Sequence, residues 1–170
     1  MSKNYCPRCG SLALSSHDGN QYCCEQCDFE LFRNAAAAVG VVLVHQQHIL
    51  LVKRSKAPKA GMWDLPGGFV NPGETAEQAL FRECQEELAF ELNCPLRYLG
   101  AWPNLYAYKA LEYPTLDIFY TVTLASRPNL TADKTEVQDI TWVSTAQCGA
   151  LDMAFTSGGQ AIAAYLKRPQ

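Results

Sequence analysis

The residues of this 170-residue chain best suited to chemistry are the acids of positions 82–87, which read Arg-Glu-Cys-Gln-Glu-Glu. Such a run is often only the solvated face of a helix. Residues 75–90 contain neither proline nor glycine, and their apolar side chains recur at helical spacing around Ala76, Ala79, Leu80 and Cys84, which predicts a helix. At about 100° per residue, Glu83 and Glu87 fall inside this apolar stripe and Glu86 falls at its edge. The acids therefore lie on the side of the helix that should be buried.

Acids in that position require a cation nearby. Carboxylates three and four residues apart on a helix repel one another, and burying them unpaired costs on the order of several kcal/mol each. Arg82 alone cannot neutralise three acids. Hard oxygen ligands that converge from one helix suit Mg²⁺ or Mn²⁺, which keeps several waters and binds the phosphate oxygens of a substrate. The helix therefore indicates metal-dependent phosphate chemistry.

A turn that contains two glycines precedes this helix, at Leu65-Pro-Gly-Gly-Phe69. Glycines let the backbone approach a ligand or metal closely, although most glycine pairs are merely turns. The chain contains no GxxxxGKS or GxxxxGKT segment, so the sequence excludes an ordinary P-loop nucleotide site.

Two CxxC pairs, Cys6 with Cys9 and Cys24 with Cys27, have the spacing of a tetrahedral zinc site. Cys23 is an alternative to Cys24 as a ligand, but Cys24 is favoured because two CxxC knuckles make the same local turn twice. A redox dithiol or free thiols are the alternatives to a metal. Four thiolates leave zinc no open position, so this zinc would be structural.

The segment from Gly68 to Phe90 resembles the Nudix box of the Nudix (MutT-related) hydrolase family. The family pattern is G, five residues, E, seven residues, then R-E-U-x-E-E-x-G-U, where U is bulky and apolar. The matching residues of this chain are Gly68, Glu74, Arg82, Glu83, Glu86 and Glu87. The chain departs from the pattern at Cys84 and Ala89, and neither departure replaces an acid.

The resemblance implies an α/β fold, a Nudix-type α/β/α sandwich with a mixed sheet, preceded by a small zinc ribbon. It implies that Glu83 and Glu87 are the main ligands of Mg²⁺ or Mn²⁺, with Glu86 as a further ligand and the Gly68 carbonyl completing the set.

Further catalytic residues follow from the same resemblance. Arg82 and Glu74 would orient the acids of the box. Glu136 lies in a segment that resembles the one bringing another carboxylate to the metals in many members of the family. On this view Glu136 is an extra ligand or the general base, and the alternative is an ordinary surface acid.

The reaction that the resemblance implies is hydrolysis of a phosphoanhydride bond in a nucleoside diphosphate linked to another moiety. The chain would then be a pyrophosphohydrolase (diphosphatase) in which a carboxylate takes the proton of a metal-bound water. The N-terminal ribbon resembles the NADH pyrophosphatase branch, which favours NADH or ADP-ribose-like substrates. Residues 100–106, however, keep only the Trp-Pro pair of that branch's Ser-Gln-Pro-Trp-Pro-Phe-Pro signature. Pro103, Tyr106 and Tyr108 leave both ADP-ribose and dinucleoside polyphosphates open.

Four side chains are candidates for binding the substrate. Arg54, like its neighbour Lys53, is suited either to pairing with phosphates or to remaining solvated. Trp102, Tyr106 and Tyr108 are suited to stacking on a nucleobase, although aromatic residues at this density are often packing residues.

The elements that must position these residues begin where the composition changes, at residues 34–35. The first 33 residues are polar, cysteine-rich and poor in aliphatic side chains, and we assign residues 1–33 to the zinc ribbon and 34–170 to the Nudix domain. Apolar runs and alternation predict a hairpin of strands 36–44 and 49–54, strands at 116–124 and 140–143, and a short helix at 161–166.

The bulk composition limits the partners. The net charge of −3 provides no basic face for nucleic acid. The longest apolar run, 35–44, is about half of what crosses a bilayer, and no charged and then apolar leader precedes the cysteines. Clustered CxxC pairs are typical of a reducing compartment. We expect a cytoplasmic protein that acts on a small nucleotide, has no membrane partner, and leaves homodimer formation open.

A second class of function is a binding module, in which the Nudix domain senses a nucleotide without hydrolysing it and the ribbon docks a partner. The intact acids of the box favour the enzyme. The first 33 residues carry three basic and four acidic residues, so the ribbon lacks the basic excess needed for docking nucleic acid. The sequence therefore favours a hydrolase over a sensor.

Overall fold

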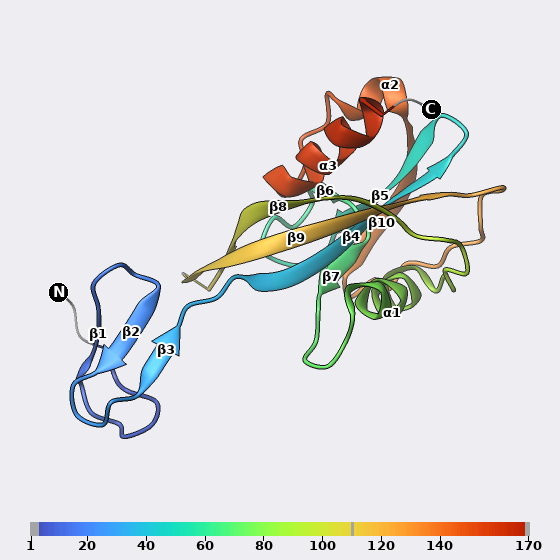
Figure 1. Ribbon diagram of the computed structural model, residues 1–170. Helices are drawn as coiled ribbons and strands as arrows, with labels where there is room; N and C mark the ends of the chain where they lie inside the picture. Colours follow the sequence, from blue (N-terminus) through green and yellow to red (C-terminus); the bar gives the residue numbers. More distant parts are fainter. Residues whose placement is uncertain (1–3, 110, 169–170) are drawn as a thin grey trace. The chain divides into compact units, whose positions relative to one another are not determined.

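A computed structural model describes residues 4–109 and 111–168 of the chain (Figure 1). The chain divides into two compact units, Met1–Ala35 and Ala36–Gln170. Within the described ranges, no helix is long and apolar enough to cross a lipid bilayer.

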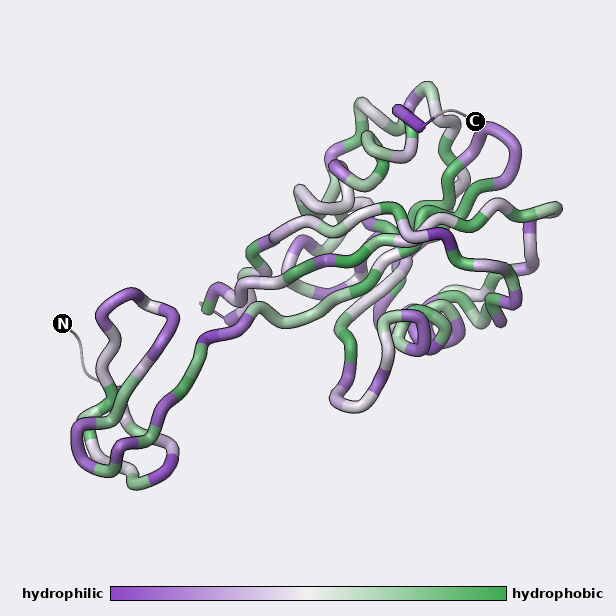
Figure 2. The backbone as a smooth tube through the Cα atoms, viewed as in Figure 1, coloured by the Kyte–Doolittle hydropathy of each residue, from purple (hydrophilic) through white to green (hydrophobic). Residues whose placement is uncertain are grey.

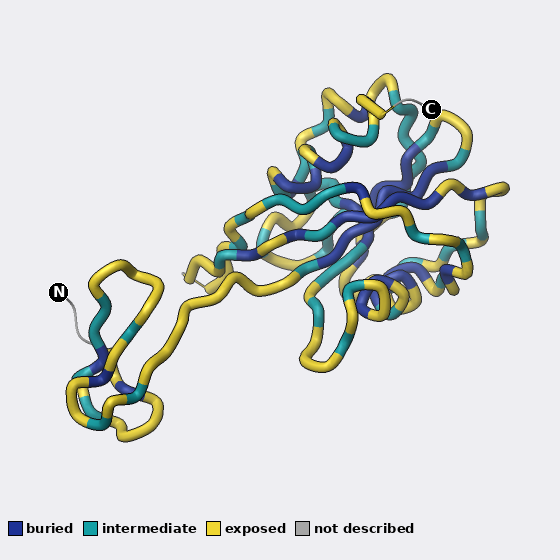
Figure 3. Tube along the Cα trace, in the orientation of Figure 1, coloured by how far each residue is buried: buried dark blue, intermediate teal, exposed yellow. Residues whose placement is uncertain are grey.

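Short strands make up the smaller unit. Strands β1 (Leu14–Ser16), β2 (Gln21–Cys24) and β3 (Glu30–Phe32) pair antiparallel in the order β1-β2-β3. Most of the unit is exposed (Figure 3), and its buried cluster consists of Cys6, Leu14 and Cys24. So small a core cannot stabilise an independent unit by hydrophobic burial alone, and a further bond network must contribute.

A mixed sheet forms the centre of the larger unit, in the strand order β10-β5-β4-β9-β8. Its strands are β4 (Ala36–His45), β5 (His48–Arg54), β8 (Arg97–Tyr108), β9 (Leu111–Thr123) and β10 (Val137–Ser144). Two short strands, β6 (Trp63–Asp64) and β7 (Gly67–Phe69), pair with β5 and β4. Neighbours β4 and β9 run parallel, whereas β10 with β5, β5 with β4, and β9 with β8 run antiparallel.

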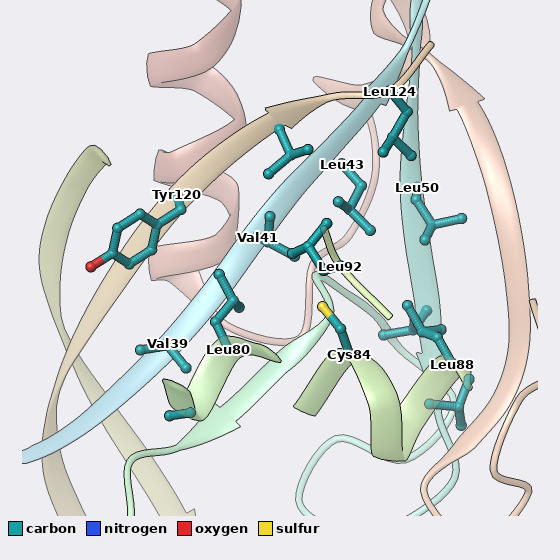
Figure 4. Packing of buried hydrophobic residues seen from close by; sticks show 14 residues of the cluster. Val39, Val41, Leu43, Leu50, Leu80, Cys84, Leu88, Leu92, Tyr120 and Leu124 are labelled. Carbon is teal, nitrogen blue, oxygen red and sulfur yellow. The ribbon is translucent and has the colours of Figure 1, made fainter. Parts of the chain in front are cut away.

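Side chains of β4 alternate between the two faces of the sheet and contribute to a hydrophobic core on each face. Val41 and Leu43 face the core that also contains the buried side chains of helix α1 (Ala76–Leu88), shown in Figure 4. Val42 and Val44 face the opposite core, which contains residues of helix α3 (Thr156–Leu166). Successive side chains of a strand point to opposite faces, so an uninterrupted apolar strand is buried on both. Figure 2 shows the hydrophobic centre of the sheet that results.

The helices cover both faces of the sheet. Helix α1 lies on one face, and α3 lies on the other together with the short helix α2 (Thr145–Cys148) (Figure 1). The predicted sandwich with a mixed sheet is confirmed. The predicted strands at 36–44, 49–54, 116–124 and 140–143 correspond to β4, β5, β9 and β10, and the predicted helix at 75–90 corresponds to α1.

Strand β8 and helix α3 are two of the elements that differ from the sequence prediction. Strand β8 was not predicted, because Gly100 and Pro103 interrupt its pattern. Proline is tolerated on an edge strand, and β8 lies at the edge of the sheet. Helix α3 begins at Thr156 instead of residue 161, although Gly158 and Gly159 are weak helix formers. Tertiary packing overrides propensity here, because Ser157 and Gly158 are buried.

Candidate active site

A pocket of about 290 Å³ lies in the larger unit beside α1 and the glycine-containing turn. Residues from β4 to β9, α1 and α3 line it. Its charged residues are Asp64, Glu83, Glu87, Asp117, Glu136, Arg54 and Arg82. The acids outnumber the bases among the described lining residues, which makes this a pocket that attracts cations.

Helix α1 presents its acids from a well-defined start. Thr75 Oγ1 accepts a hydrogen bond from the Gln78 N–H at 3.2 Å, and Gln78 Oε1 accepts one from the Thr75 N–H at 2.8 Å. This reciprocal capping box satisfies two of the backbone N–H groups left free at a helix start. The first turn is thereby fixed, and with it the direction in which Glu83 and Glu87 point.

Glu87 is the most deeply placed acid of the box. Its side chain lies in the pocket, and its Oε2 accepts a hydrogen bond from the Gly67 N–H at 3.0 Å. Burial raises the pKa of Glu87 to about 8, with further increases from the Glu83, Asp64 and Glu136 carboxylates. The described residues provide no ion pair for Glu87, so its ionised form has no cationic partner among them.

Arg82 organises the remaining acids of the box. Its guanidinium forms two hydrogen bonds with Glu74, at 2.7 and 3.0 Å, and its Nη1 donates to Glu83 at 2.7 Å and to Glu86 at 2.9 Å. The hydrogen bonds from Arg82 lower the pKa of Glu74 to about 2, whereas burial raises the pKa of Glu83. Glu83 and Glu87 are each 9% exposed, but the Glu86 side chain is 58% exposed. Glu83 and Glu87 are therefore buried as predicted, whereas Glu86 is exposed and does not line the pocket.

The glycines of the turn are required by close contacts. A Cβ on Gly67, whose φ is +149°, would lie 2.0 Å from the Val39 carbonyl oxygen. A Cβ on Gly68 would lie 2.4 Å from Glu83 Oε1. The absence of both side chains lets the turn pack between β4 and the acids of α1. Gly68 therefore lies directly beside Glu83.

Glu136 joins the pocket from the loop before β10. Its Oε1 is paired with Lys56 Nζ at 3.0 Å, and its side chain is 51% exposed. Its charge contributes to raising the pKa values of both Glu83 and Glu87. Glu136 is therefore close enough to interact with the acids of α1, while one of its oxygens is held by a lysine.

These acids fit a divalent cation by their chemistry. The donor set consists of carboxylate oxygens with the Gly68 backbone alongside, which are the ligand types that Mg²⁺ and Mn²⁺ prefer. Burial, together with repulsion from neighbouring carboxylates, raises the pKa values of Glu83 and Glu87, and a bound cation would remove that penalty. Arg82 neutralises part of the charge but makes no ion pair with Glu87.

The structure separates the four predicted substrate contacts. Arg54 and Tyr106 line the pocket. Trp102 and Tyr108, both in described segments, do not: the Trp102 ring packs against Phe119, with centroids 5.8 Å apart, and Tyr108 is exposed. Arg54 Nη1 donates a hydrogen bond to Asp64 Oδ2 at 3.0 Å, so one nitrogen of the guanidinium is already paired with a carboxylate.

Several pocket residues were not identified from the sequence. Asp64 is partly buried and is paired with Arg54, and burial raises its pKa to about 6. Asp117, Thr115, Asn104, Ser157 and Phe155 also line the pocket. Their only sequence signal is the period-two spacing of Thr115, Asp117 and Phe119, which places three side chains on one face of β9.

The smaller unit contains a separate cluster of four cysteines, Cys6, Cys9, Cys24 and Cys27, whose sulfur atoms all lie within 4.8 Å of one another. The Cys6–Cys27 and Cys9–Cys24 sulfur distances are both 3.7 Å. Tetrahedral zinc with bonds of ~2.3 Å would separate its sulfurs by about 3.8 Å. The cluster therefore has the size of a zinc site.

Cys23 does not belong to this cluster. It is exposed, and its sulfur lies 4.0 Å from Glu30 Oε1, whereas Cys24 is buried and its sulfur belongs to the cluster. A hydrogen bond with Ser11 lowers the pKa of Cys9 to about 6, and burial raises that of Cys27 to about 12. A thiol with a lowered pKa readily becomes the thiolate that a metal binds.

Comparison with known families gives one match that covers most of the chain. The sequence model of the NUDIX domain matches residues 34–165. Among solved structures, the NUDIX domain of Shewanella oneidensis NrtR, crystallised with ADP ribose, superposes with a TM-score of 0.68. It is 27% identical, and the match covers 81% of this chain and 90% of that one.

Two of the similar curated proteins carry names of different activities. "NAD-capped RNA hydrolase NudC" of Vibrio vulnificus is 32% identical over 61% of this chain and 39% of the relative. A "Putative 8-oxo-dGTP diphosphatase" of Bacillus subtilis is 38% identical over 63% of this chain and 64% of the relative. The matched segment thus spans less than two thirds of the length of either relative.

Proposed function

Because this chain belongs to the NUDIX domain family, we propose that its pocket hydrolyses the phosphoanhydride bond of a nucleoside diphosphate linked to another moiety. The proposal includes the assignment of residues 34–170 to the catalytic domain. The observation that carries it is the burial of Glu83 and Glu87 in one pocket with no ion pair for Glu87 among the described residues. Buried acids that lack a cation are costly, and they persist at sites that bind one.

In this proposal Glu83, Glu87, Glu86 and the Gly68 carbonyl hold Mg²⁺ or Mn²⁺. The bound cation would lower the pKa of a water molecule and neutralise charge on the diphosphate. The remaining functions belong to side chains of the chain itself. Arg82, anchored by Glu74, keeps Glu83 and Glu86 facing the same side of α1. The Gly67 N–H orients Glu87.

Glu136 is our candidate for the base that takes the proton from water. It lines the pocket and influences the pKa values of Glu83 and Glu87, which supports its place beside the reacting atoms. Its partner Lys56 holds one carboxylate oxygen, so the other remains available. This arrangement would fix the side chain without consuming its capacity to accept a proton.

We further propose NADH or an ADP-ribose-like compound as the substrate. Two observations support this choice: the ADP ribose bound to the NrtR domain, and the resemblance to relatives named NAD-capped RNA hydrolase. Arg54 at the pocket wall offers a cationic group to a phosphate. The relative named 8-oxo-dGTP diphosphatase makes a nucleoside triphosphate the competing substrate class.

For the smaller unit we propose a structural zinc ribbon held by Cys6, Cys9, Cys24 and Cys27 and extending over residues 1–33. The matched sulfur distances and the small hydrophobic cluster support it. Four thiolates leave the metal no position for a substrate, so the role of this zinc is to stabilise the fold.

The test is to incubate the purified chain with Mg²⁺ or Mn²⁺ and, separately, NADH, ADP-ribose, FAD, dinucleoside polyphosphates and nucleoside triphosphates. Chromatography then identifies the products. AMP released from NADH or ADP-ribose is the expected result. Pyrophosphate released from a triphosphate would replace the substrate proposal, and ADP-ribose binding without any product would replace the enzyme with a nucleotide sensor.

A further inference from the structure

Strand β9 presents a polar surface at the floor of the pocket. Thr115, Asp117 and Phe119 are spaced two residues apart, so their side chains share one face of the strand, and all three line the pocket. Asn104 of the neighbouring strand β8 lies directly across from Thr115 in the register. None of these residues belongs to the acidic box, and the proposed hydrolysis leaves them without a role.

Asp117 is held in place by two donors on the same oxygen. Its Oδ2 accepts hydrogen bonds from Asn104 Nδ2 at 3.0 Å and from Ser157 Oγ at 2.5 Å. Its other oxygen accepts no hydrogen bond from the described residues, and the Asn104 amide oxygen likewise accepts none. Asp117 is only 8% exposed. The second carboxylate oxygen of Asp117 and the amide oxygen of Asn104 can therefore accept hydrogen bonds from a bound molecule.

Thr115 independently points to a ligand at the same place. Its side-chain oxygen is buried and has no hydrogen-bond partner among the described residues, and the residue is 3% exposed. A buried hydroxyl without a partner costs roughly 1–3 kcal/mol. Because Thr115 lines the pocket beside Asp117, a bound molecule is positioned to supply the missing partner.

Aromatic rings flank this floor. The Tyr106 and Phe155 rings stack at 5.4 Å with an interplanar angle of 28°, and the Phe69 ring meets Tyr106 edge-on at 5.2 Å. The Arg54 guanidinium lies over Phe155, 5.0 Å from its centroid. Flat apolar walls beside a hydrogen-bonding floor suit a planar heterocycle.

We infer that Asp117, Asn104 and Thr115 form a base-recognition site that selects a nucleobase carrying an exocyclic amine, such as adenine, over its keto counterpart. An amine donates two N–H groups, which match the free oxygens of Asp117 and Asn104. A keto oxygen in the same place would face two acceptors and leave them unpaired. Ribose hydroxyls are also donors, but the aromatic flank favours the planar base.

This inference rests on the proposed function for the identity of the substrate, but its test does not depend on turnover. AMP and IMP differ at the base by an amine against a keto group. We expect titration calorimetry to show that the chain binds AMP at least about tenfold more tightly than IMP, because mispaired buried acceptors are penalised to that degree. Equal affinities in the unaltered chain would overturn the inference without any variant.

Two variants test which residues cause the preference for AMP over IMP. Asp117→Asn presents an amide in place of the carboxylate and should bring the AMP-to-IMP affinity ratio to within about threefold of unity. Thr115→Val removes the hydroxyl at nearly constant shape and should weaken AMP binding by roughly three- to tenfold. Asp139→Asn, at an exposed position of β10 outside the pocket, is the matched control and should keep the original ratio.

The competing ligand group is distinguished with 2′-deoxy-AMP. One result would overturn the base assignment: the unaltered chain prefers AMP over 2′-deoxy-AMP, and Asp117→Asn loses this preference but keeps the AMP-to-IMP affinity ratio. Asp117 would then bind the ribose hydroxyl instead of the base. Preserved AMP-to-IMP selection in a chain that hydrolyses nothing would contradict only the proposed reaction. Turnover without selection would contradict only the base-recognition site.

Discussion

At the scale of single residues, the pocket combines two carboxylates that are buried with different partners. Glu83 shares Arg82 with Glu74 and Glu86, whereas Glu87 receives a backbone N–H from Gly67. The ion pair with Arg82 offsets part of the free-energy cost of burying the Glu83 carboxylate. The cost of burying the Glu87 carboxyl has no such offset unless a cation is bound. Replacing Glu87 should therefore raise stability and lower activity by more than replacing Glu83.

We expect Glu87→Gln to reduce turnover by roughly 100-fold or more, because it removes a charged ligand of the proposed metal. In a chelator the same variant should unfold at a higher temperature than the unaltered chain. The amide oxygen can still accept the Gly67 hydrogen bond, and the variant no longer bears the free-energy cost of protonating a buried carboxyl that would be ionised in the unfolded chain. Steady-state kinetics and thermal unfolding in EDTA measure the two effects.

Glu91→Gln is the matched control for this substitution, because Glu91 is exposed and does not line the pocket. It should leave both kcat and the unfolding temperature unchanged. Retained turnover in Glu87→Gln would remove Glu87 from the catalytic site, and a lower unfolding temperature in EDTA would show that its charge is already compensated.

The stability of the chain should depend on pH through Asp64. Burial raises the pKa of Asp64 from its ordinary 3.8 to about 6, so between these values the folded state holds a proton that the unfolded state has released. Stability contributed by this group is therefore lost as pH rises from 4 to 6. The unfolding free energy of the chain relative to Asp64→Asn should fall by roughly 2–3 kcal/mol between pH 4 and pH 7.

Urea unfolding of both chains at pH 4, 5, 6 and 7 measures this difference. Comparing the two chains cancels the titrations that do not depend on Asp64, and Arg54 is present in both chains. A difference that is flat over this range would mean that the Arg54 ion pair fully offsets the burial of Asp64.

At the scale of elements, helix α1 ends in a conformation that its sequence does not favour. Ala89 closes the helix with φ 50° and ψ 37°, and its N–H donates to carbonyls of the last turn. The left-handed conformation costs a residue with a Cβ about 1–2 kcal/mol. The family pattern has glycine at this position, where the same cap would be free of that cost.

Ala89→Gly should therefore stabilise the larger unit by about 1 kcal/mol, because the cap geometry is retained and the strain is relieved. Ala89→Val is the informative counterpart, since a β-branched residue fits positive φ poorly and should destabilise the unit. Chemical denaturation of the three chains measures the order. Destabilisation by glycine would show that Ala89 contributes packing that outweighs its backbone strain.

At the scale of the whole molecule, the chain combines a unit with two hydrophobic cores and a unit with almost none. The two cores of the larger unit lie on opposite faces of one sheet and consist of hydrophobic side chains. In our proposal, the smaller unit depends on zinc bound by its four cysteines, because its buried core is small. The two units should therefore respond differently when metal is withdrawn.

We expect one structural zinc per chain, and we expect its removal to unfold residues of the smaller unit while the larger unit keeps its cooperative transition. Elemental analysis measures the zinc, and amide hydrogen exchange before and after treatment with a strong chelator locates the loss. Cys24→Ser should abolish zinc binding, whereas Cys23→Ser should preserve it, because the Cys23 sulfur lies outside the cluster. Zinc retained by Cys24→Ser and lost by Cys23→Ser would reverse the ligand assignment.

The sequence by itself determined the features that depend on local spacing. Helical periodicity placed Glu83 and Glu87 on the buried side of α1, and the structure confirms their burial. The number of residues that separate Gly68 and Glu74 from these acids indicated the family, and the family match confirms it. Local spacing suffices here because one helix and the turn before it present all of these residues.

Only the tertiary structure decided which residues surround the rest of the pocket. Trp102, Tyr106 and Tyr108 are separated by four and two residues along β8, so periodicity places all three on one face and cannot choose among them. The packing of β9 and α3 leaves Tyr106 beside Phe155 in the pocket and puts Trp102 against Phe119. Asp117 was likewise hidden, because its partners Asn104 and Ser157 are 13 and 40 residues away in the chain. Contacts over such separations arise from how the elements pack, and no spacing within a single element encodes them.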